Sequence, residues 1–336
     1  MCALILAFVL SFTLFAQEQW PNRYLIVEGG KYGFIDAQGN VVIEPKFHEC
    51  GSFHEGLARF RMVDKWGFID IHGKKVIPAK YDEALDFSEG LAAVRKGKFW
   101  GFVNKNDSLV IPLMYTKALS FKEGLAPVKM GEKLLFMWIN HGYGYINQKN
   151  EVVIPAAYTY AYPFSDGLAA VSYTKKLLYI FPLYVQRNFI NHQGQAIIES
   201  SYQGLTTFSE GLARFQKDGQ IGFINTEGKV VIEAQFDNAA NFSEGLAAVR
   251  LGKSWGYINK KGKFVIPAQY DYALSFSEGL APVNRGPEWF FIDKTGKQAI
   301  SQTFEACKPF NQGLANVRLN GQVSYINKKG EIVWPR

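Results

Sequence analysis

The sequence predicts an all-β protein built as a tandem array of short repeats. Three observations support this prediction. The nine letters FSEGLAAVR occur at 87–95 and again, unchanged, at 242–250. The motif F-x-[ED]-G-L-A, to which they belong, recurs along the chain, mostly at steps of 34 residues. Glycine (32) and the aromatic residues (7 Trp, 17 Tyr and 27 Phe) are abundant, which is typical of short strands joined by tight turns.

Each repeat is expected to contribute three strands. The first is G-L-A-A-V, in which small and large residues alternate. The second follows the pattern aromatic-Gly-aromatic-Ile-[ND], as in WGYIN at 255–259. The third is a short apolar run such as 264–266, which a proline usually ends because proline cannot donate a ladder hydrogen bond. Nine such units follow one another.

The turn between strands two and three carries the most specific local signal. Its first position is Asp or Asn in all nine copies, as at Asn259, and its fourth is Gly, Asp or Asn, as at Gly262. Asp and Asn cap the backbone of a turn, and the fourth position requires a residue that tolerates a positive φ. We therefore predict a type I hairpin turn in every unit.

Most aromatic residues recur at fixed positions of the unit, which indicates that the rings pack between units. Burying one such ring stabilises a fold by roughly 1.5–3 kcal/mol. No single repeat of this length could fold alone, so stability is expected to come from the stacking of neighbours.

The pattern resembles the WG-repeat family of bacterial proteins, also called KWG repeats. The resemblance rests on WGFI at 66–69, GLAAVRKGKFWG at 90–101 and the downstream VIP with its aromatic residue, and it extends from about Arg23 to Trp334. It implies a tandem β-repeat, often in exported or envelope proteins, with no assigned catalytic residues. Three units depart from the Trp-Gly pair, with Arg187-Asn188, Trp289-Phe290 and Val323-Ser324 in its place.

We predict that residues 1–16 are a signal peptide and that 17–336 form a single array. The apolar run at 3–15 is too short to span a membrane and precedes polar residues, although no Lys or Arg precedes it. The nine units are expected near 23–52, 53–86, 87–120, 121–163, 164–207, 208–241, 242–275, 276–309 and 310–336.

The ends of the array do not reveal a strand that would join them. The first unit starts with its own first strand and the last ends on its own third strand. The sequence therefore favours an open, curved or superhelical array, and a closed propeller-like ring is the alternative.

Two cysteines would remain after cleavage of the signal peptide. Cys50 and Cys307 could form a disulfide in an exported protein. However, each stands three residues before the motif phenylalanine, where most other copies have alanine, and this favours a small buried side chain.

No catalytic residue, cofactor or metal site is predicted. An active site needs one constellation, whereas the acid before the motif glycine recurs in unit after unit and is expected to be a solvated turn residue. The five histidines show no metal-ligand spacing, and no G-x-S-x-G, P-loop or G-x-G-x-x-G motif occurs. The formal net charge is +7, but the lysines are scattered over the predicted turns, and we predict no nucleic-acid partner.

Two consecutive units are longer than the others. KMGEKLLFMWINHGY at 129–143 and SYTKKLLYIFPLYVQR at 172–187 extend the hairpin between strands one and two, and both contain K-L-L followed by aromatic residues. The two extensions could pair with each other and hide their rings, or they could form a binding surface. The predicted binding residues are Phe136, Trp138, Tyr173, Tyr179, Phe181 and Tyr184.

Together these observations predict an exported, non-catalytic, monomeric interaction module without a membrane span, either periplasmic or secreted. It is expected to bind protein or peptide through the long hairpins of units 4 and 5. The alternative is an envelope glycan-binding protein that uses aromatic platforms and basic turns.

Overall fold

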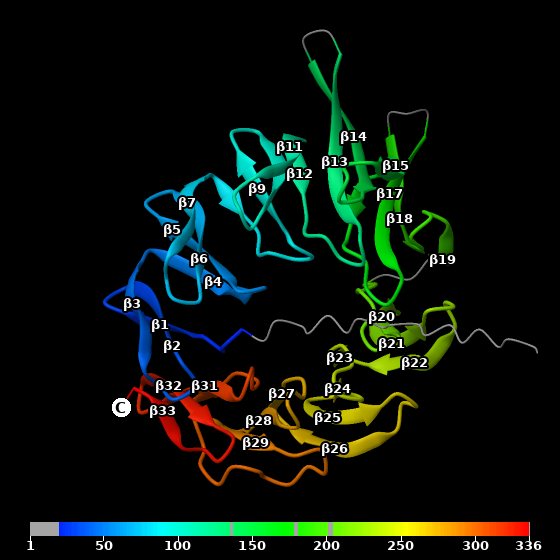
Figure 1. The fold of residues 1–336 in the computed structure, drawn as a ribbon. Coiled ribbons are helices and arrows are strands. Elements are labelled where there is room, and N and C mark those ends of the chain that lie inside the picture. Colours follow the sequence, from blue (N-terminus) through cyan, green and yellow to red (C-terminus); the bar gives the residue numbers. More distant parts are fainter. Residues whose placement is uncertain (1–19, 135–136, 178–180, 201–203, 336) are drawn as a thin grey trace, which may run out of the picture.

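The computed structural model describes residues 20–134, 137–177, 181–200 and 204–335; the side chains of 132–141, 174–186 and 200 lie outside this description. Within these residues 33 strands form nine antiparallel sheets, which follow one another around a closed ring (Figure 1). No helix capable of crossing a membrane occurs in this described part of the chain. The all-β tandem architecture is confirmed. The predicted signal peptide, 1–16, lies outside the described residues.

We number the sheets as blades 1 to 9 in chain order. Blades 1 to 3 comprise β1 (Tyr24–Glu28), β2 (Lys31–Ile35) and β3 (Val41–Phe47); β4 (Glu49–His54), β5 (Leu57–Met62), β6 (Lys65–Asp70) and β7 (Lys75–Tyr81); and β8 (Glu83–Ala84), β9 (Leu91–Lys96), β10 (Phe99–Asn104) and β11 (Leu109–Tyr115). Blades 4 to 6 comprise β12 (Lys117–Ala118), β13 (Ala126–Leu134), β14 (Met137–Ile146) and β15 (Val152–Tyr158); β16 (Tyr160–Ala161), β17 (Ala169–Leu177), β18 (Phe181–Ile190) and β19 (Ala196–Ser200); and β20 (Leu212–Lys217), β21 (Gln220–Asn225) and β22 (Val230–Phe236). Blades 7 to 9 comprise β23 (Asn238–Ala239), β24 (Leu246–Leu251), β25 (Ser254–Asn259) and β26 (Phe264–Tyr270); β27 (Tyr272–Ala273), β28 (Ala281–Arg285) and β29 (Glu288–Ile292); and β30 (Ala306–Cys307), β31 (Leu314–Leu319), β32 (Gln322–Asn327) and β33 (Ile332–Trp334).

The blades contain a short strand that the sequence patterns did not predict. In blade 3 it is β8, which pairs with β9 through Glu83 opposite Arg95 and Ala84 opposite Val94. Equivalent two-residue strands begin blades 4, 5, 7, 8 and 9. Such a strand is too short to show a period of two, so alternation of polar and apolar residues cannot reveal it.

The third strand is longer than predicted, because the proline lies inside it. In blade 2, Phe68 is opposite Ile77 and Trp66 is opposite Tyr81, so β7 gains two residues relative to β6 at Pro78. This bulge needs no N–H from the proline. A side chain at Gly67 would approach the Ile77 carbonyl oxygen to 2.4 Å, which explains the glycine of the Trp-Gly pair.

The Asx turns between strands two and three are confirmed. The Asn259 side-chain oxygen accepts hydrogen bonds from the backbone N–H groups of Lys261 at 3.0 Å and Lys263 at 3.2 Å. Gly262 adopts a φ of +75° at the fourth position. Where glycine is absent, Asp107 and Asn150 adopt the same left-handed conformation, with φ of +61° and +65°.

The hydrophobic core lies between successive blades, as the recurring rings predicted. Phe68 of blade 2 and the motif residue Phe87 pack with their ring centroids 4.8 Å apart, and Phe102 meets Phe121 in the same way. Cys50 and Cys307 are free and buried at the position that alanine occupies elsewhere, and burial raises the pKa of each thiol to about 12. The interpretation of both cysteines as small core side chains is confirmed.

The expectation of an open array is wrong, because blades 1 and 9 pack against each other and close the ring. No strand is exchanged between these two blades among the described residues, as the sequence indicated. Closure relies on side chains instead. The Tyr325 hydroxyl donates to the Leu25 carbonyl oxygen at 2.8 Å, and the rings of Tyr24 and Tyr325 lie 5.8 Å apart.

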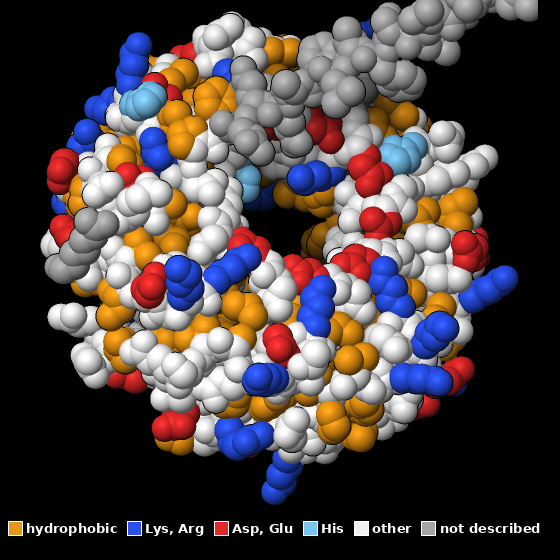
Figure 2. Space-filling view, turned by 60° about the horizontal axis from the view of Figure 1, so that its bottom comes forward, with side chains coloured by type: hydrophobic (Ala, Val, Ile, Leu, Met, Phe, Trp, Pro, Cys, Tyr) orange, Lys and Arg blue, Asp and Glu red, His pale blue; other side chains and the backbone are white. Residues whose placement is uncertain are grey.

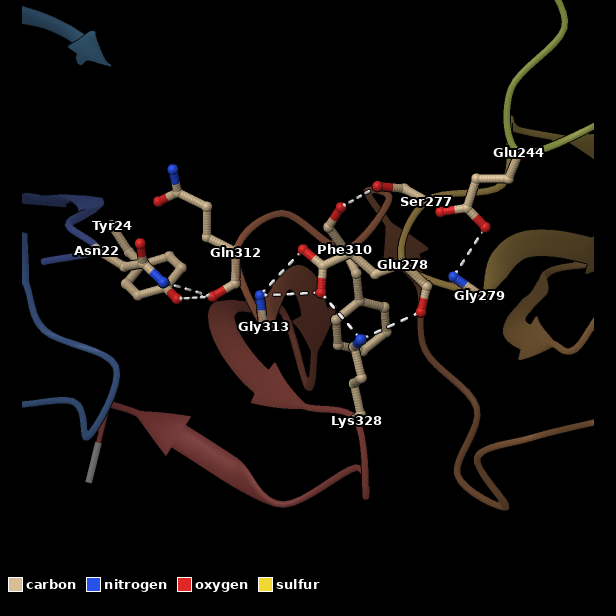
Figure 3. Close-up of polar contacts among 10 residues, drawn as sticks. All are labelled: Asn22, Tyr24, Glu244, Ser277, Glu278, Gly279, Phe310, Gln312, Gly313 and Lys328. Atoms are coloured by element: carbon tan, nitrogen blue, oxygen red, sulfur yellow. Dashed lines mark hydrogen bonds and ion pairs between the residues drawn. The ribbon is translucent and has the colours of Figure 1, made fainter. Parts of the chain in front are cut away.

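Hydrogen bonds and ion pairs link neighbouring blades around the ring, and we call them inter-blade clamps. The motif acid takes part in them. The Glu278 carboxylate accepts from the Gly313 N–H in the next blade, and Lys328 of that blade lies 3.0 Å from the same carboxylate. The Ser277 hydroxyl donates to the Phe310 carbonyl oxygen at 2.6 Å (Figure 3). Figure 2 shows a central opening bordered by acidic and basic side chains. The motif acid therefore joins neighbouring blades, rather than acting only as a solvated turn residue.

Candidate functional site

The site begins where the Trp-Gly pair is replaced. In blade 7 the pair is intact, and Trp255 is buried against Tyr272 of the next blade at 5.2 Å. The Trp289 ring also lies near Tyr272, with the two ring centroids 6.0 Å apart. The two-residue strand at Tyr272 thus has two tryptophan rings beside it, one from the intact pair of blade 7 and one from Trp289, which keeps the tryptophan of a replaced pair.

In blade 5 both members of the pair change. Arg187 replaces the aromatic residue and is exposed, and Asn188 replaces the glycine and is buried. Because a side chain at this position would collide with a bulged third strand, β19 pairs with β18 in regular register here. Asn188 is opposite Glu199 and Phe189 is opposite Ile198.

The replacement leaves a pocket of about 480 Å³ beside β16. Its wall comprises Tyr160, Tyr162, Ala170, Val171, Ser172, Arg187, Asn188, Gly204 and Leu205. Tyr160 is at the position of Tyr272, and it is 60% exposed, compared with 45% for Tyr272. No two-residue strand precedes blade 6 among the described residues, and Gly204 and Leu205 form the far wall instead.

The polar groups of this pocket have unused hydrogen-bonding capacity. The Arg187 side chain has no hydrogen bond or ion pair within the described residues, and the Asn188 side-chain oxygen is buried without a partner there. Burial raises the pKa of Tyr143, and the nearby Tyr160 adds to this shift. The Tyr143 hydroxyl is therefore neutral near pH 7. A cation beside exposed rings suits a ligand that carries a carboxylate or carbonyl oxygen next to an apolar group.

The long hairpins of blades 4 and 5 rise from the strands beside this pocket. β13 pairs with β14 from Ala126 opposite Ile146 to Leu134 opposite Met137, and β17 pairs with β18 over a similar length. In Figure 1 both hairpins extend beyond those of the other blades.

The structure places only part of the predicted site. Tyr173 lies on β17, where it is half-buried and opposite Gln186. The pKa of Tyr158 is raised, mainly by burial and to a smaller extent by Tyr173. Phe136 and Tyr179 lie outside the described residues. Trp138, Phe181 and Tyr184 lie on β14 and β18, where the side chains are not described. These six residues therefore stay a prediction as a binding set.

Sequence reasoning missed Arg187, Asn188, Gly204 and Leu205 as pocket residues. The signal was present, because the Arg187-Asn188 pair interrupts the Trp-Gly pattern. What the pattern did not show is that the missing ring leaves a space beside Tyr160, since the two-residue strand was not predicted.

A second pocket, of about 870 Å³, lies at the seam between blades 9 and 1. It also occurs at a replaced Trp-Gly pair, since Val323 lies in its wall and Ser324 follows. Tyr24 to Glu28 of β1, Tyr325 and Trp334 also line this pocket.

Neither pocket shows the groups of a hydrolytic or metal site. No group of three or more His, Cys, Asp or Glu side chains that could hold a metal ion occurs in the part of the chain that is described. Among the described residues, the walls of the two pockets contain no histidine, and Glu28 is their one carboxylate.

Comparison with known proteins places the repeats in a family. The family model described as "WG containing repeat" matches residues 32–66, 66–98, 100–133, 143–176, 189–220, 221–254, 255–286 and 289–322. No curated protein matches the chain.

Solved structures resemble the chain only at the level of a similar fold. Apo AztD from Citrobacter koseri shares 11% identity and a TM-score of 0.43, over 82% of this chain and 93% of that chain. Hsv2p from Kluyveromyces lactis shares 10% identity and a TM-score of 0.41, over 71% and 87%. PorZ from Porphyromonas gingivalis shares 10% identity and a TM-score of 0.35, over 94% and 50%.

Likenesses at these scores carry no inference about function. The repeat matches are different in kind, because they cover most of the chain and follow the observed blades one after another. The chain therefore belongs to the family of proteins built from WG containing repeats.

Proposed function

We propose that this protein is an exported, non-catalytic binding module for a protein or peptide partner. Its main site is the pocket of blade 5 together with the long hairpins of blades 4 and 5. The observation that carries the proposal is the pocket of about 480 Å³ left by the replaced Trp-Gly pair, because a regular repeat would fill this space. The apolar run at 3–15 supports export to the periplasm or beyond.

The chemistry of the pocket favours a peptide segment. A volume of this size accommodates one or two side chains, and binding sites are commonly apolar with a few placed polar groups. Tyr160 and Tyr162 offer exposed rings, and Arg187 offers a cation without a partner in the described chain. Tyrosine and arginine are enriched among the residues that dominate protein interfaces. An acidic or carbonyl-rich peptide with an apolar side chain fits this combination.

A non-catalytic role is supported by the use of the repeated acids. Glu210, Glu244 and Glu278 each accept a hydrogen bond from a glycine N–H of the next blade and pair with a lysine. The oxygens of these carboxylates are thus engaged by donors of the fold itself.

The test refills the pocket. We expect the double variant Arg187→Trp with Asn188→Gly to restore the regular repeat, keep the strand content and lose binding. Peptides would be selected on the wild-type protein from a displayed random library, with depletion on the double variant. Their affinities would then be measured by calorimetry. The matched single variants are Tyr160→Ala, which should weaken binding at least tenfold, and Tyr272→Ala in blade 8, which should not.

Equal peptide affinity for the wild type and the refilled variant would contradict the proposal. A parallel screen with envelope glycans tests the alternative. Glycan binding that depends on Tyr160 and Tyr162, without any selected peptide, would favour a glycan-binding protein instead.

A further inference from the structure

An ordinary junction between two blades has three contributors. Between blades 2 and 3, the first blade supplies Leu57, Phe68 and Ile77, and the second supplies Ala92, Val94 and Val103. The segment that connects the blades supplies the other three members of the cluster, Tyr81, Ala84 and Phe87.

The seam between blades 9 and 1 has only the first two contributors. Blade 9 supplies Leu314, Tyr325 and Trp334, and blade 1 supplies Tyr24, Ile26 and Ile35, at the positions just described for blades 2 and 3. The Tyr24 ring takes the place of the Phe87 ring, since it packs on Tyr325 as Phe87 packs on Phe68. The positions of Tyr81 and Ala84 have no counterpart among the described residues of the seam.

The cavity of about 870 Å³ lies where these two side chains would be. At the ordinary junction Tyr81 is opposite Trp66, and the residue equivalent to Trp66 in blade 9 is Val323. Val323 lines the cavity, as do Leu25, Ile26 and Val27 of β1, which are equivalent to the residues that face β8 in blade 3.

The edge of β1 also has free backbone groups. In blade 3 the Arg95 carbonyl accepts from the Asp82 N–H at 2.8 Å, and the Ala93 carbonyl accepts from the Leu85 N–H at 2.9 Å. The equivalent carbonyls in blade 1 belong to Val27 and Leu25. Tyr325 donates to Leu25, whereas the Val27 carbonyl has no partner within the described residues.

The hairpin of blade 1 offers one more unused donor. The Asp82 carboxylate accepts from the Gly97 N–H at 2.6 Å, and Asp237 and Asp271 accept from Gly252 and Gly286 in the same way. The glycine equivalent to Gly97 in blade 1 is Gly29, whose N–H has no such acceptor in the described chain.

We infer that the seam cavity is an acceptor site for an extended segment of a partner protein, which would add a short strand to β1. The segment carries an aromatic residue, an acid, any residue and then a small residue. This order is read from four of the internal junctions, where it occurs as Tyr81 to Ala84, Phe236 to Ala239, Tyr270 to Ala273 and Phe304 to Cys307. The other four have His48, Thr116, Thr159 or Gln203 in place of the acid. Addition of an edge strand is an established mode of peptide recognition, in which backbone bonds give affinity and pockets give specificity.

The charge of the cavity wall, and the fact that the internal segments are already in use, indicate which molecule supplies the added strand. Arg23 and Lys308 line the cavity beside a single acid, Glu28, and so favour a segment of negative charge. A second copy of this chain is a poor donor, because these four segments are already built into its own junctions. The segment is therefore expected from a different protein.

The test uses a peptide with the sequence of 79–86, AKYDEALD, and the full chain. We expect one peptide to bind per chain in calorimetry and the thermal midpoint to rise as peptide is added. Peptides with Tyr81→Ala or Asp82→Asn should bind at least tenfold more weakly. A scrambled peptide should not bind. The refilled variant of blade 5 should bind AKYDEALD as the wild type does, which separates this site from the proposed main site.

Two protein variants keep the test specific. Val27→Pro removes the backbone N–H on the free edge of β1 without removing a bond to β2, so it should abolish peptide binding while the ring stays folded. Val27→Ala should bind normally. Unchanged binding by Val27→Pro, or equal binding of the scrambled peptide, would overturn the inference. A dimeric wild-type chain that the peptide converts to monomers would overturn the choice of a different protein as the donor.

Discussion

The carboxylate of Glu278 lies 3.1 Å from the backbone nitrogen of Gly313 in the next blade and accepts its hydrogen bond. Glu278 does so from a left-handed conformation, with a φ of +55°, and the glycine that follows it, Gly279, has a φ of +87°. Two positive φ values in succession define a type I′ turn, in which Asn, Asp or Gly is favoured. Glutamate is present at the first position because its longer side chain reaches the neighbouring blade.

Removal of one clamp should destabilise the ring measurably. We expect Glu278→Ala to lower the free energy of unfolding by about 1–3 kcal/mol, because the Gly313 N–H loses a charged acceptor and Lys328 loses its carboxylate partner, although it keeps the Glu278 carbonyl oxygen. Gln312 provides a matched control, since it has the same φ of +55° and its side chain points away from its neighbours (Figure 3). Gln312→Ala should change stability by less than about 0.5 kcal/mol. Equal losses in denaturant titrations of the two variants would contradict the clamp.

The two copies of the repeated nonapeptide should be energetically equivalent. Phe87 and Phe242 are both buried, and each packs edge-on against a phenylalanine at 4.8 or 4.9 Å. We expect Phe87→Ala and Phe242→Ala each to reduce the free energy of unfolding by about 3–5 kcal/mol. A loss below about 1 kcal/mol in either variant, measured by chemical denaturation, would show that this column does not hold the blades together.

The clamps should make stability depend on pH in the acid range. Burial acts to raise the pKa of Glu244, but the Gly279 N–H and Lys294 outweigh it, so the pKa lies below its usual value of 4.5. Because the folded-state pKa is lowered, this stabilisation is present above pH 4.5 and is lost as the pH falls through the folded-state pKa. The stability difference between the wild type and Glu244→Gln should therefore shrink between about pH 5 and pH 3. A constant difference across this range would contradict the assignment.

The long hairpins should be dispensable for folding and required for binding. Met130 to His141 and Thr174 to Gln186 would each be replaced by Lys-Gly-Lys, the turn of blade 3. We expect circular dichroism to show little change beyond the removed strand residues, because, apart from Met130, the inter-blade clusters use positions nearer the base of the strands. Peptides selected on the wild type should lose affinity. If they bind the shortened protein as tightly, the hairpins are packing elements and the blade 5 pocket alone holds the ligand.

The repeat itself was predictable from sequence because each unit repeats the same physical requirements. Asn259 and Gly262 determine the turn that contains them through local backbone contacts. The recurrence of phenylalanine at the position of Phe87 indicates that this ring is buried. Ring closure was not predictable in the same way. It depends on Tyr24 and Tyr325, which come from opposite ends of the chain and meet only if the curvature of the whole array is correct.

The candidate site was predictable in part for a related reason. The Arg187-Asn188 pair was visible as a departure from the pattern, but its effect depends on the two-residue strand that contains Tyr160. The clamps were missed because the motif glutamate and the next motif glycine lie 35 residues apart, as Glu278 and Gly313 do, with no local sign that they meet.

The closure of the ring by side chains has a consequence for where local unfolding begins. Eight of the nine junctions are crossed by the polypeptide, so their two faces cannot separate far. Among the described residues, the faces of blades 9 and 1 are instead held by side-chain contacts such as that of Tyr325 with Leu25. Partial opening should start at this junction and leave the remaining blades stacked. In native-state hydrogen exchange, amides of β1 and β32 should therefore exchange through an opening of lower free energy than those of β9 and β6.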